Sequence, residues 1–278
     1  MPGFEIEIRI ESLDDVHVHE ETIPELLEQM IHNIRLGGKI RDPLIIDSNT
    51  RVVLDGMHRV AALREIGCRY LPACLIDYRS PKVMVGCWHR VLSGRPWESK
   101  FLDFIKSLGL EAISSPLEEA FQDLEERKAT AALLVGENCH LFKAPDNNIR
   151  ESYEWIKRIE IAMKKEGFSI FYETKSDTEK LVKSGKVSAA LLVPRVHKEE
   201  VLKAALSGNI FAHKTTRHIL PVRPVNVGTT IELLRGDRTQ DQVDSSLVEQ
   251  LSKRKFERLP EGTLYEGQRY EEELLVFR

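Results

Sequence analysis

The chain has 278 residues, of which 42% are hydrophobic and 30% are charged, and its net charge is -4. This length allows one large domain or two small ones, and we expect two. The charge argues against a protein whose whole surface binds nucleic acid. No apolar stretch could span a bilayer, and residues 1–11 are rich in Glu and lack a signal-peptide core, so we expect a cytoplasmic protein without a membrane partner.

The 4 cysteines form no C-x-x-C pair and lack the density of a disulfide scaffold. We therefore expect reduced, structural thiols and no zinc site. His17 and His19 could share one face of a His-rich loop and bind a metal ion. Because no third ligand stands nearby, we favour a surface loop or a loop that lines a site.

Hydrophobic spacing in the first 110 residues predicts a compact α/β unit. A capping-box pattern at 22–25, with Pro24 in the first turn, marks the start of its first helix. In chain order, the expected elements are a strand over 4–10, a helix to 37, strands over 43–47 and 51–54, a helix ending at Gly67, strands over 72–78 and 83–91, and a helix through 101–108.

From about residue 111 onward, helices alternate with strands, which indicates a second α/β layer or domain. Residues 131–135 and 189–193 are identical pentapeptides, which either reflect a weak internal duplication or recur by chance. Around them we expect helices over 153–167, 176–185 and 197–206 and a strand over 168–172. The predicted fold class is therefore α/β, with one domain over 1–110 and another over 111–278 that contributes a loop over 211–224.

The segment 52–59 places Asp55, Gly56, His58 and Arg59 where an apolar strand turns into a helix. Unpaired N–H groups and the positive end of the helix dipole attract phosphate there, and Gly56 lets the main chain come close. The alternative is an ordinary helix start, in which Asp55 is an N-cap and the two basic side chains are solvated. The segment alone does not decide between these interpretations.

The segment 211–224 gathers hydroxyls, cations and imidazoles between apolar anchors. Arg217 offers a planar fork for a carboxylate or a phosphate, Thr215 and Thr216 offer hydroxyl donors, and Lys214 offers a mobile charge. Such a group can also occur on an exposed loop without any function. By itself the segment favours that second interpretation.

The two polar clusters, together with Glu20 and Glu21, favour a functional site over polar segments without function. Phosphoryl transfer needs cations and amides that hold phosphates, a carboxylate such as Asp55 for Mg²⁺, and a second carboxylate that accepts the proton of the attacking hydroxyl. The chain contains no Walker A sequence, no Gly-rich kinase loop and no HRD or DFG signature. These absences exclude the large kinase classes.

The chain resembles the ParB/sulfiredoxin nucleotide-binding fold and, within it, the free L-serine kinase family of the SerK and SbnI type. The residues that carry the resemblance are His19–Glu21, 43–46, 54–63, 214–224, 231–234 and 265–274. This family implies transfer of a phosphate from ADP or ATP to free L-serine, with Mg²⁺ as the ion. The product would be O-phospho-L-serine for cysteine-related metabolism.

The resemblance also implies roles for individual residues. Glu20, preferred over Glu21, would be the general base, Asp55 would orient the metal or a phosphate, and His58 and Arg59 would bind phosphates. Serine, through its carboxylate or the transferred phosphate, would be held by Thr215, Arg217 and His218, in a cleft between the two domains. Trp88 would either line the substrate pocket or be a core aromatic of its strand.

Three other functions compete with this one. A ParB-like nucleotide-binding regulator would need an Arg-rich phosphate motif and a helix-turn-helix downstream, whereas this chain has His58-Arg59 followed by an apolar strand. Sulfiredoxin chemistry would need a reactive cysteine beside the phosphate motif, and residue 57 is Met, where the kinase family more often has His. A nucleotide-binding protein without catalysis stays open.

Overall fold

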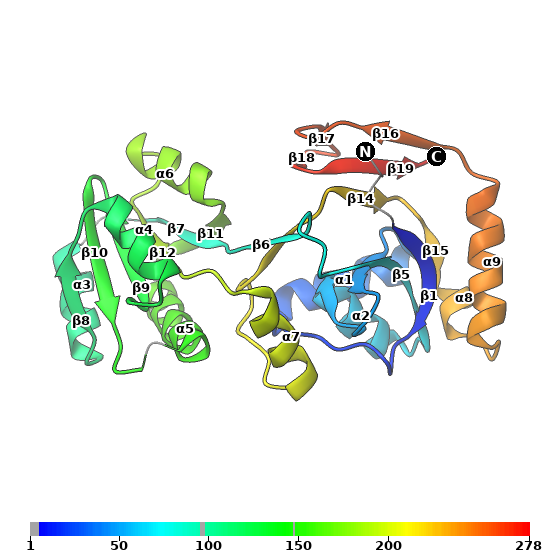
Figure 1. Ribbon diagram of the computed structural model, residues 1–278, viewed down its shortest axis with the longest axis horizontal. Coiled ribbons are helices and arrows are strands. Elements are labelled where there is room, and N and C mark those ends of the chain that lie inside the picture. Colours follow the sequence, from blue (N-terminus) through cyan, green and yellow to red (C-terminus); the bar gives the residue numbers. More distant parts are fainter. Residues whose placement is uncertain (1–5, 95–97, 147) are drawn as a thin grey trace. The chain divides into compact units, whose positions relative to one another are not determined.

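The computed structural model describes residues 6–94, 98–146 and 148–278. The chain forms two compact units (Figure 1). The first unit comprises Met1–Met84, Lys198–His213 and His218–Arg278, and the second comprises Val85–His197 and Lys214–Arg217. The division therefore falls after residue 84 instead of residue 110, and most of the C-terminal third joins the N-terminal segment. The expectation of a site between two domains stays a prediction.

The first unit is built on a four-stranded sheet with the strand order β1-β5-β3-β4. Strand β3 runs parallel to β5, whereas β1 pairs with β5 and β4 with β3 in the antiparallel sense. The elements of this part are β1 (Glu7–Ser12), α1 (Pro24–Gly37), β2 (Lys39–Ile40), β3 (Leu44–Asp47), β4 (Val53–Asp55), α2 (Met57–Ile66) and β5 (Tyr70–Ile76).

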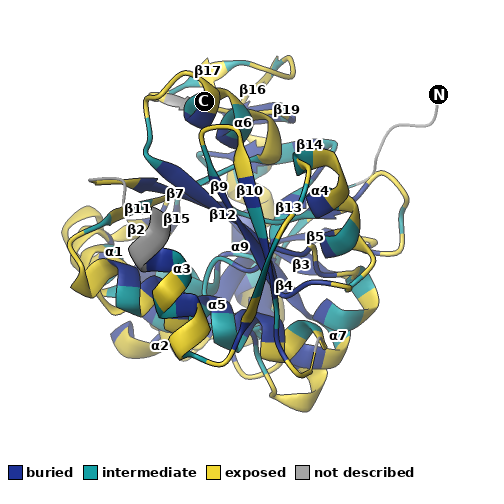
Figure 2. Cartoon of the chain, turned by 90° about the vertical axis from the view of Figure 1, so that its left-hand side faces the viewer, coloured by how far each residue is buried: buried dark blue, intermediate teal, exposed yellow. Residues whose placement is uncertain are grey.

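Burial explains why the strands and helices of this unit have different sequence patterns. Strands β3 and β5 are buried along their whole length and read as continuous apolar runs. Helix α2 buries Val60, Leu63 and Ile66 at helical spacing and ends at Gly67, which has a left-handed backbone. Helix α1, in contrast, buries only Ile34 and leaves most of its surface exposed (Figure 2).

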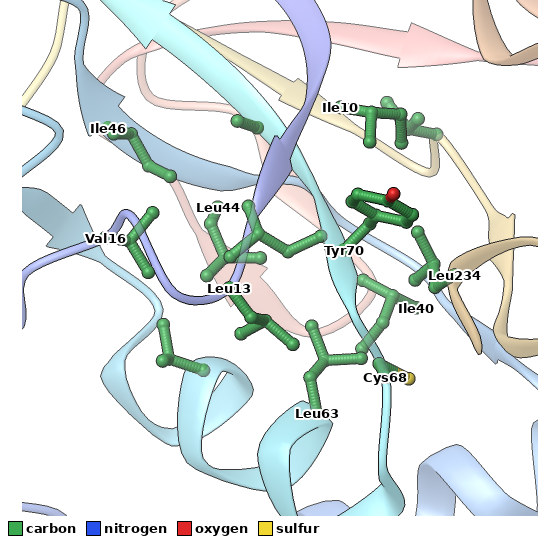
Figure 3. Packing of buried hydrophobic residues seen from close by; sticks show 14 of the residues in the cluster. Ile10, Leu13, Val16, Ile40, Leu44, Ile46, Leu63, Cys68, Tyr70 and Leu234 are labelled. Carbon is green, nitrogen blue, oxygen red and sulfur yellow. The ribbon is translucent and has the colours of Figure 1, made fainter. Parts of the chain in front are cut away.

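The C-terminal part of the chain completes this core. Figure 3 shows Leu234 packed in the same cluster as Ile10, Leu63 and Tyr70. Phe277, near the end of the chain, belongs to this cluster too, which is why the last third does not form a separate domain. The elements are α7 (Lys198–Ser207), β14 (Val222–Val225), β15 (Thr229–Thr230), α8 (Ile231–Arg235), α9 (Gln240–Ser252), β16 (Phe256–Leu259), β17 (Leu264–Tyr265), β18 (Gln268–Arg269) and β19 (Glu273–Phe277).

The second unit contains a six-stranded antiparallel sheet with the strand order β11-β7-β12-β9-β10-β8. Its identical pentapeptides form the neighbouring strands β9 and β12. The elements are β7 (His89–Ser93), α3 (Glu98–Ser107), β8 (Glu111–Ser114), α4 (Leu117–Glu125), β9 (Ala131–Val135), β10 (Asn138–Lys143), α5 (Ile149–Lys165), β11 (Ser169–Glu173), α6 (Lys175–Lys183) and β12 (Ala189–Leu192).

Side chains alternate between the two faces of this sheet. Val91 and Leu141 point to the face where α4 and α6 pack. The neighbouring residues Arg90 and Phe142 point to the opposite face, where Arg90 meets Glu160 of α5 and Phe142 meets Phe101 of α3. Both faces of the sheet are therefore covered by helices.

Several predicted boundaries are wrong in informative ways. The strand expected over 83–91 is two strands, β6 (Met84–Gly86) and β7, and Trp88 lies between them. The N-cap of α1 is Ile23 instead of Thr22, with which the expected capping box begins. Helix α6 has Thr174 as its N-cap and begins one residue before the expected start at 176. A short strand, β13 (Arg217–Ile219), lies within the segment 211–224, which was expected to be a loop.

None of the helices in the described ranges has the length and apolar character needed to cross a membrane.

Candidate functional site

The turn from β4 into α2 has the backbone that the sequence predicts. Gly56 is the N-cap of α2 and has a φ of 112°, in the region that side chains other than glycine rarely adopt. A Cβ atom at this position would lie 3.0 Å from Leu44 Cγ and 3.0 Å from Arg59 Nε. Glycine is therefore required here both by conformation and by space.

Asp55 is not a helix cap, because α2 has no side-chain cap. Its Oδ2 accepts hydrogen bonds from Arg59 Nη2, at 3.1 Å, and from Arg223 Nη1. Burial raises the pKa of this carboxyl, but the guanidinium groups of Arg223 and Arg59 lower it by more, so that the pKa lies well below its ordinary value. Asp55 is therefore an anion held between two cations.

The same two arginines are anchored on their other sides. Arg59 Nη1 donates to the carbonyl oxygens of Asp42, at 2.9 Å, and Pro43, at 2.7 Å. Arg223 Nε donates to Glu272 Oε1 at 2.6 Å. Only 15% of the Arg59 side chain and 16% of the Arg223 side chain are exposed. The ordinary helix start with solvated basic residues is therefore wrong for Arg59.

The His58 side chain makes a hydrogen bond to the main chain before α1, which was not expected of a phosphate ligand. Its Nε2 accepts a hydrogen bond from the backbone N–H of Ile23 at 2.9 Å. An acceptor nitrogen implies that the neutral ring carries its proton on Nδ1. His58 thereby satisfies a donor at the start of α1, and we expect it to fix the position of α2 relative to α1.

The His19–Glu21 segment lies beside Phe211. The backbone N–H of Phe211 donates to His19 O at 2.8 Å, and the N–H of Glu21 donates to Phe211 O at 2.9 Å. The His19 side chain is fully buried and its Nδ1 lies 2.8 Å from Val53 O, which makes this nitrogen a donor. Burial lowers the pKa of His19. Its Nε2 lies 3.7 Å from Glu20 Oε1, so a buried imidazole adjoins a carboxylate that is 7% exposed.

His218 belongs to the first unit and is also buried. Its Nε2 lies 2.8 Å from the Tyr78 hydroxyl, and its ring centroid is 5.4 Å from that of His19. Burial lowers the pKa of His218 well below its ordinary value, although a hydrogen bond to the Leu54 carbonyl opposes this effect. With both ring nitrogens in use, a neutral His218 offers no charge to a carboxylate. We therefore revise its expected role from anion binding to support of the surrounding residues.

A second group lies in the other unit and consists of Trp88 and Lys214–Arg217. Lys214 Nζ lies 5.6 Å from the centroid of the Trp88 ring, and Arg217 Cζ lies 5.3 Å from it. Both distances are within the range of cation–π contacts. Trp88 is half-buried, outside any strand, so it contacts these cations and is not a core aromatic of a strand.

The hydroxyl residues of this segment are less accessible than expected. Thr215 is fully buried and Thr216 is 6% exposed, whereas Lys214 and Arg217 are half-buried. Lys214 has a φ of 58°, which is uncommon for a side chain other than glycine. The two cations are therefore the parts of the segment that solvent reaches.

The grouping expected from the sequence differs from the one in the structure, since Trp88 lies in the second unit with Lys214–Arg217 and His218 lies in the first unit. Arg223, Glu272 and Tyr78 were not assigned to the site. Arg223 stands between Pro221 and Pro224 in a segment that was already conspicuous, and this was the only available signal. Nothing local indicated the other two.

The structure allows a test of whether Mg²⁺ fits. No group of three or more His, Cys, Asp or Glu side chains with metal-site geometry occurs among the residues that the structure describes. Mg²⁺ in phosphoryl-transfer sites is usually held by one or two carboxylates together with substrate phosphates. Asp55, whose side chain is 39% exposed, fits that role only if a bound phosphate shares its two arginine partners.

Known proteins with similar sequences and structures include L-serine kinases. No family model matches the chain. The chain is 27% identical over 241 residues to the ATP-dependent L-serine kinase of Staphylothermus marinus, covering 84% of this chain and 94% of that protein. It is 28% identical over 228 residues to the ADP-dependent L-serine kinase SerK of Thermococcus kodakarensis, covering 80% and 90% respectively. A ParB-like protein of Sulfolobus acidocaldarius is also similar, with 27% identity over 205 residues, covering 72% of this chain and 84% of that protein.

A solved structure supports the same relationship. The structure of a free serine kinase in complex with AMP superposes with a TM-score of 0.70 and 26% identity, over 84% of this chain and 96% of that one. These comparisons confirm the resemblance and the mixed α/β fold that the sequence analysis predicted.

Proposed function

Starting from this relationship to the free L-serine kinases, we propose that the chain is a phosphotransferase that transfers a phosphate from ADP or ATP to the hydroxyl of free L-serine. The product is O-phospho-L-serine, a compound of cysteine-related metabolism. The observation that carries this proposal is the pair of guanidinium groups, from Arg59 and Arg223, that meet at the start of α2.

The arginine pair supports phosphate binding by charge and by shape. A guanidinium binds phosphate oxygens through parallel N–H donors, and the N-terminus of a helix adds main-chain donors and a positive potential. Because Gly56 has no Cβ atom, the Arg59 guanidinium can pack against the main chain at the helix start. In the proposal, nucleotide phosphates replace part of the contact that Asp55 now makes with the two arginines.

Asp55 would hold Mg²⁺ together with the nucleotide phosphates. The ion would neutralise charge on the transferred phosphoryl group. The residues of the chain do the remaining work: Arg59 and Arg223 hold the donor phosphates, and Asp55 orients them.

Glu20 is proposed as the general base, ahead of Glu21. The Glu20 side chain is 7% exposed and lies beside the buried His19, whereas Glu21 is half-buried. A general base must be held in a fixed position within hydrogen-bond reach of the hydroxyl, and the packed surroundings of Glu20 suit that requirement better. Glu20 takes the proton of the serine hydroxyl as that oxygen attacks the phosphorus atom.

Serine recognition is assigned to the group around Trp88. Arg217 and Lys214 provide positive charge for the serine carboxylate, and Trp88 provides an apolar wall. Thr215 and Thr216 support the segment from within, because both are buried. The proposed compartment is the cytoplasm, since Cys68, Cys74, Cys87 and Cys139 are all free thiols.

The test is ³¹P NMR of the purified protein with Mg²⁺ and L-serine, supplied in turn with ADP and ATP. We expect a phosphoserine resonance that grows with at least one donor, which identifies the reaction and its donor together. Nucleotide binding by calorimetry without any phosphoserine would overturn the proposal. That result would instead favour a ParB-like nucleotide-binding regulator, which DNA-binding assays would then examine.

A further inference from the structure

A buried ion pair lies on one face of the sheet in the second unit, and the proposed function does not use it. The Arg90 side chain is 1% exposed and that of its partner Glu160, from α5, is 4% exposed. Arg90 Nε donates to Glu160 Oε1. Burial lowers the pKa of Arg90, but the charge and hydrogen bond of Glu160 raise it, so that the pKa lies above its ordinary value and Arg90 is a buried cation.

Two tyrosines surround this ion pair. Tyr172 of β11 lies directly opposite Arg90 of β7 in the antiparallel register, so both side chains are on the face toward α5. The Tyr172 hydroxyl donates to Glu160 Oε2 at 3.2 Å. Arg90 Cζ lies 5.4 Å from the centroid of the Tyr172 ring and 5.7 Å from that of Tyr153. The guanidinium is therefore held by a carboxylate and by two rings.

The ion pair and its two tyrosines make three contacts with the proposed serine-binding group, which consists of Trp88 and Lys214–Arg217. Arg90 Nη1 donates to the Trp88 carbonyl oxygen at 2.6 Å. The Tyr153 hydroxyl lies 3.1 Å from Thr215 O and 2.8 Å from Pro194 O. Lys214 Nζ lies 5.8 Å from the centroid of the Tyr172 ring. The residues beneath the group therefore contact the main chain of Trp88 and of Thr215 as well as the Lys214 ammonium.

We propose that Arg90, Glu160 and Tyr153 are positioning residues that set the orientation of Trp88 and of Lys214–Arg217 for the amino-acid substrate. This inference rests on the proposed function for the identity of that substrate. A buried ion pair adds little net stability, because desolvation offsets the attraction between its charges. The directional hydrogen bonds of Arg90 to Trp88 O and of Tyr153 to Thr215 O, in contrast, fix the two main-chain positions that carry the aromatic wall and the cations.

Tyr153→Phe is the sharpest variant, because it removes only the hydroxyl and keeps the ring beside Arg90. We expect the KM for serine to rise about fivefold to tenfold, as the loss of one hydrogen bond implies, with the affinity for nucleotide unchanged. The matched control is Tyr70→Phe in the first unit. Tyr70 is also buried, and its hydroxyl donates to the Arg238 carbonyl oxygen at 3.0 Å. This control should leave the KM for serine unchanged.

Arg90→Lys provides a second variant that keeps the charge. A lysine cannot reproduce the planar fork that contacts Glu160 and the Trp88 carbonyl at once. We expect a rise in the KM for serine at least as large as in Tyr153→Phe, again without a change in nucleotide affinity. An equal loss of serine and nucleotide affinity in both variants would overturn the proposal, because general destabilisation would then explain the effect.

Hydrogen–deuterium exchange separates this inference from the proposed function, because it needs no substrate. The amides of Lys214–Arg217 should exchange faster in Tyr153→Phe than in the wild-type protein and should be unchanged in Tyr70→Phe. Unchanged exchange in Tyr153→Phe would overturn the positioning role even if serine is the substrate. If the wild-type protein makes no phosphoserine, the proposed function fails, and the exchange result still decides whether these residues position the segment.

Discussion

Each unit of the protein contains an arginine bound to a carboxylate inside the fold, and the two arginines have different surroundings. Arg223 in the first unit is 16% exposed and contacts two carboxylates, Asp55 and Glu272, the first of which is 39% exposed. Arg90 in the second unit is 1% exposed and contacts one carboxylate and two aromatic rings. Arg223 can therefore accept a new anion, whereas Arg90 holds its neighbours in place.

The physical basis of this difference is solvent. At Asp55, water reaches the carboxylate, so an incoming phosphate can replace part of its contact with Arg223 without leaving a charge isolated in the interior. At Glu160 no such exchange is open, because both charges lie in the interior and loss of the Arg90 contact would remove the cation from a buried carboxylate. The first arrangement suits binding, and the second suits support.

Glu20→Gln tests the part of the comparison that assigns chemistry to the first unit. We expect kcat for serine phosphorylation to fall by about 10²- to 10⁴-fold, which is the usual contribution of a general base. Nucleotide affinity, measured by calorimetry, should not change. Glu21→Gln is the control and should keep most of the activity. A large loss in Glu21→Gln and none in Glu20→Gln would reverse the assignment of the base.

Arg90→Met tests the supporting role of the second arginine. Removing Arg90 takes away the cation beside the buried Glu160 carboxylate, and we expect the free energy of unfolding to fall by about 3–5 kcal/mol. Urea unfolding measures this change. The double variant Arg90→Met/Glu160→Leu removes both charges and should recover much of the stability. A double variant that is less stable than Arg90→Met would show that the pair does not act through uncompensated charge.

Arg223→Met tests the binding role of the first arginine. Asp55 keeps Arg59 as a partner and is partly solvated, but Glu272, whose side chain is 9% exposed, loses its cation. We therefore expect a stability loss of about 3–5 kcal/mol, as in Arg90→Met. Nucleotide affinity should fall by about 1.5–3 kcal/mol, the usual range for hydrogen bonds to charged groups. Calorimetry with ADP and ATP gives the value. Unchanged affinity would remove Arg223 from the phosphate site and end the contrast between the two arginines.

Local signals explain why the turn around Gly56 could be predicted. An apolar run before Asp55, helical spacing of apolar residues after it and Gly67 as a stop lie within a few residues of one another. The observed helix, Met57–Ile66, agrees with that prediction. The strand expected over 83–91 failed because the apolar residues on either side of Cys87 and Trp88 do not reveal the break there.

Contacts between distant residues explain what could not be predicted. Arg223 is 168 residues from Asp55 and Glu160 is 70 residues from Arg90, and no local pattern links such pairs. The expected domain boundary near 110 failed for the same reason, since Phe277 packs in the cluster that contains Ile10. Spacing along the chain shows which elements form, whereas tertiary packing decides which of them meet.

The smallest expected effect concerns pH and a buried histidine of the second unit. His89 is 2% exposed, and its Nδ1 accepts a hydrogen bond from Val193 N–H at 3.2 Å. Burial, with the nearby Arg90 and Lys175 charges, lowers the pKa of His89 to about 3. In the unfolded chain, His89 therefore binds a proton below about pH 6.5. In the folded chain it stays neutral until the pH falls to about 3.

This difference lowers stability as the pH falls below 6.5, with a slope that approaches about 1.4 kcal/mol per pH unit for this residue. His89→Asn keeps an acceptor for Val193 N–H and removes the titrating group, so urea unfolding at pH 6.5 and 5.5 should show a shallower loss. The exposed His32 provides the control, and His32→Asn should keep the wild-type slope. An unchanged slope in His89→Asn would mean that the buried histidines of the first unit, His19 and His218, account for the pH dependence.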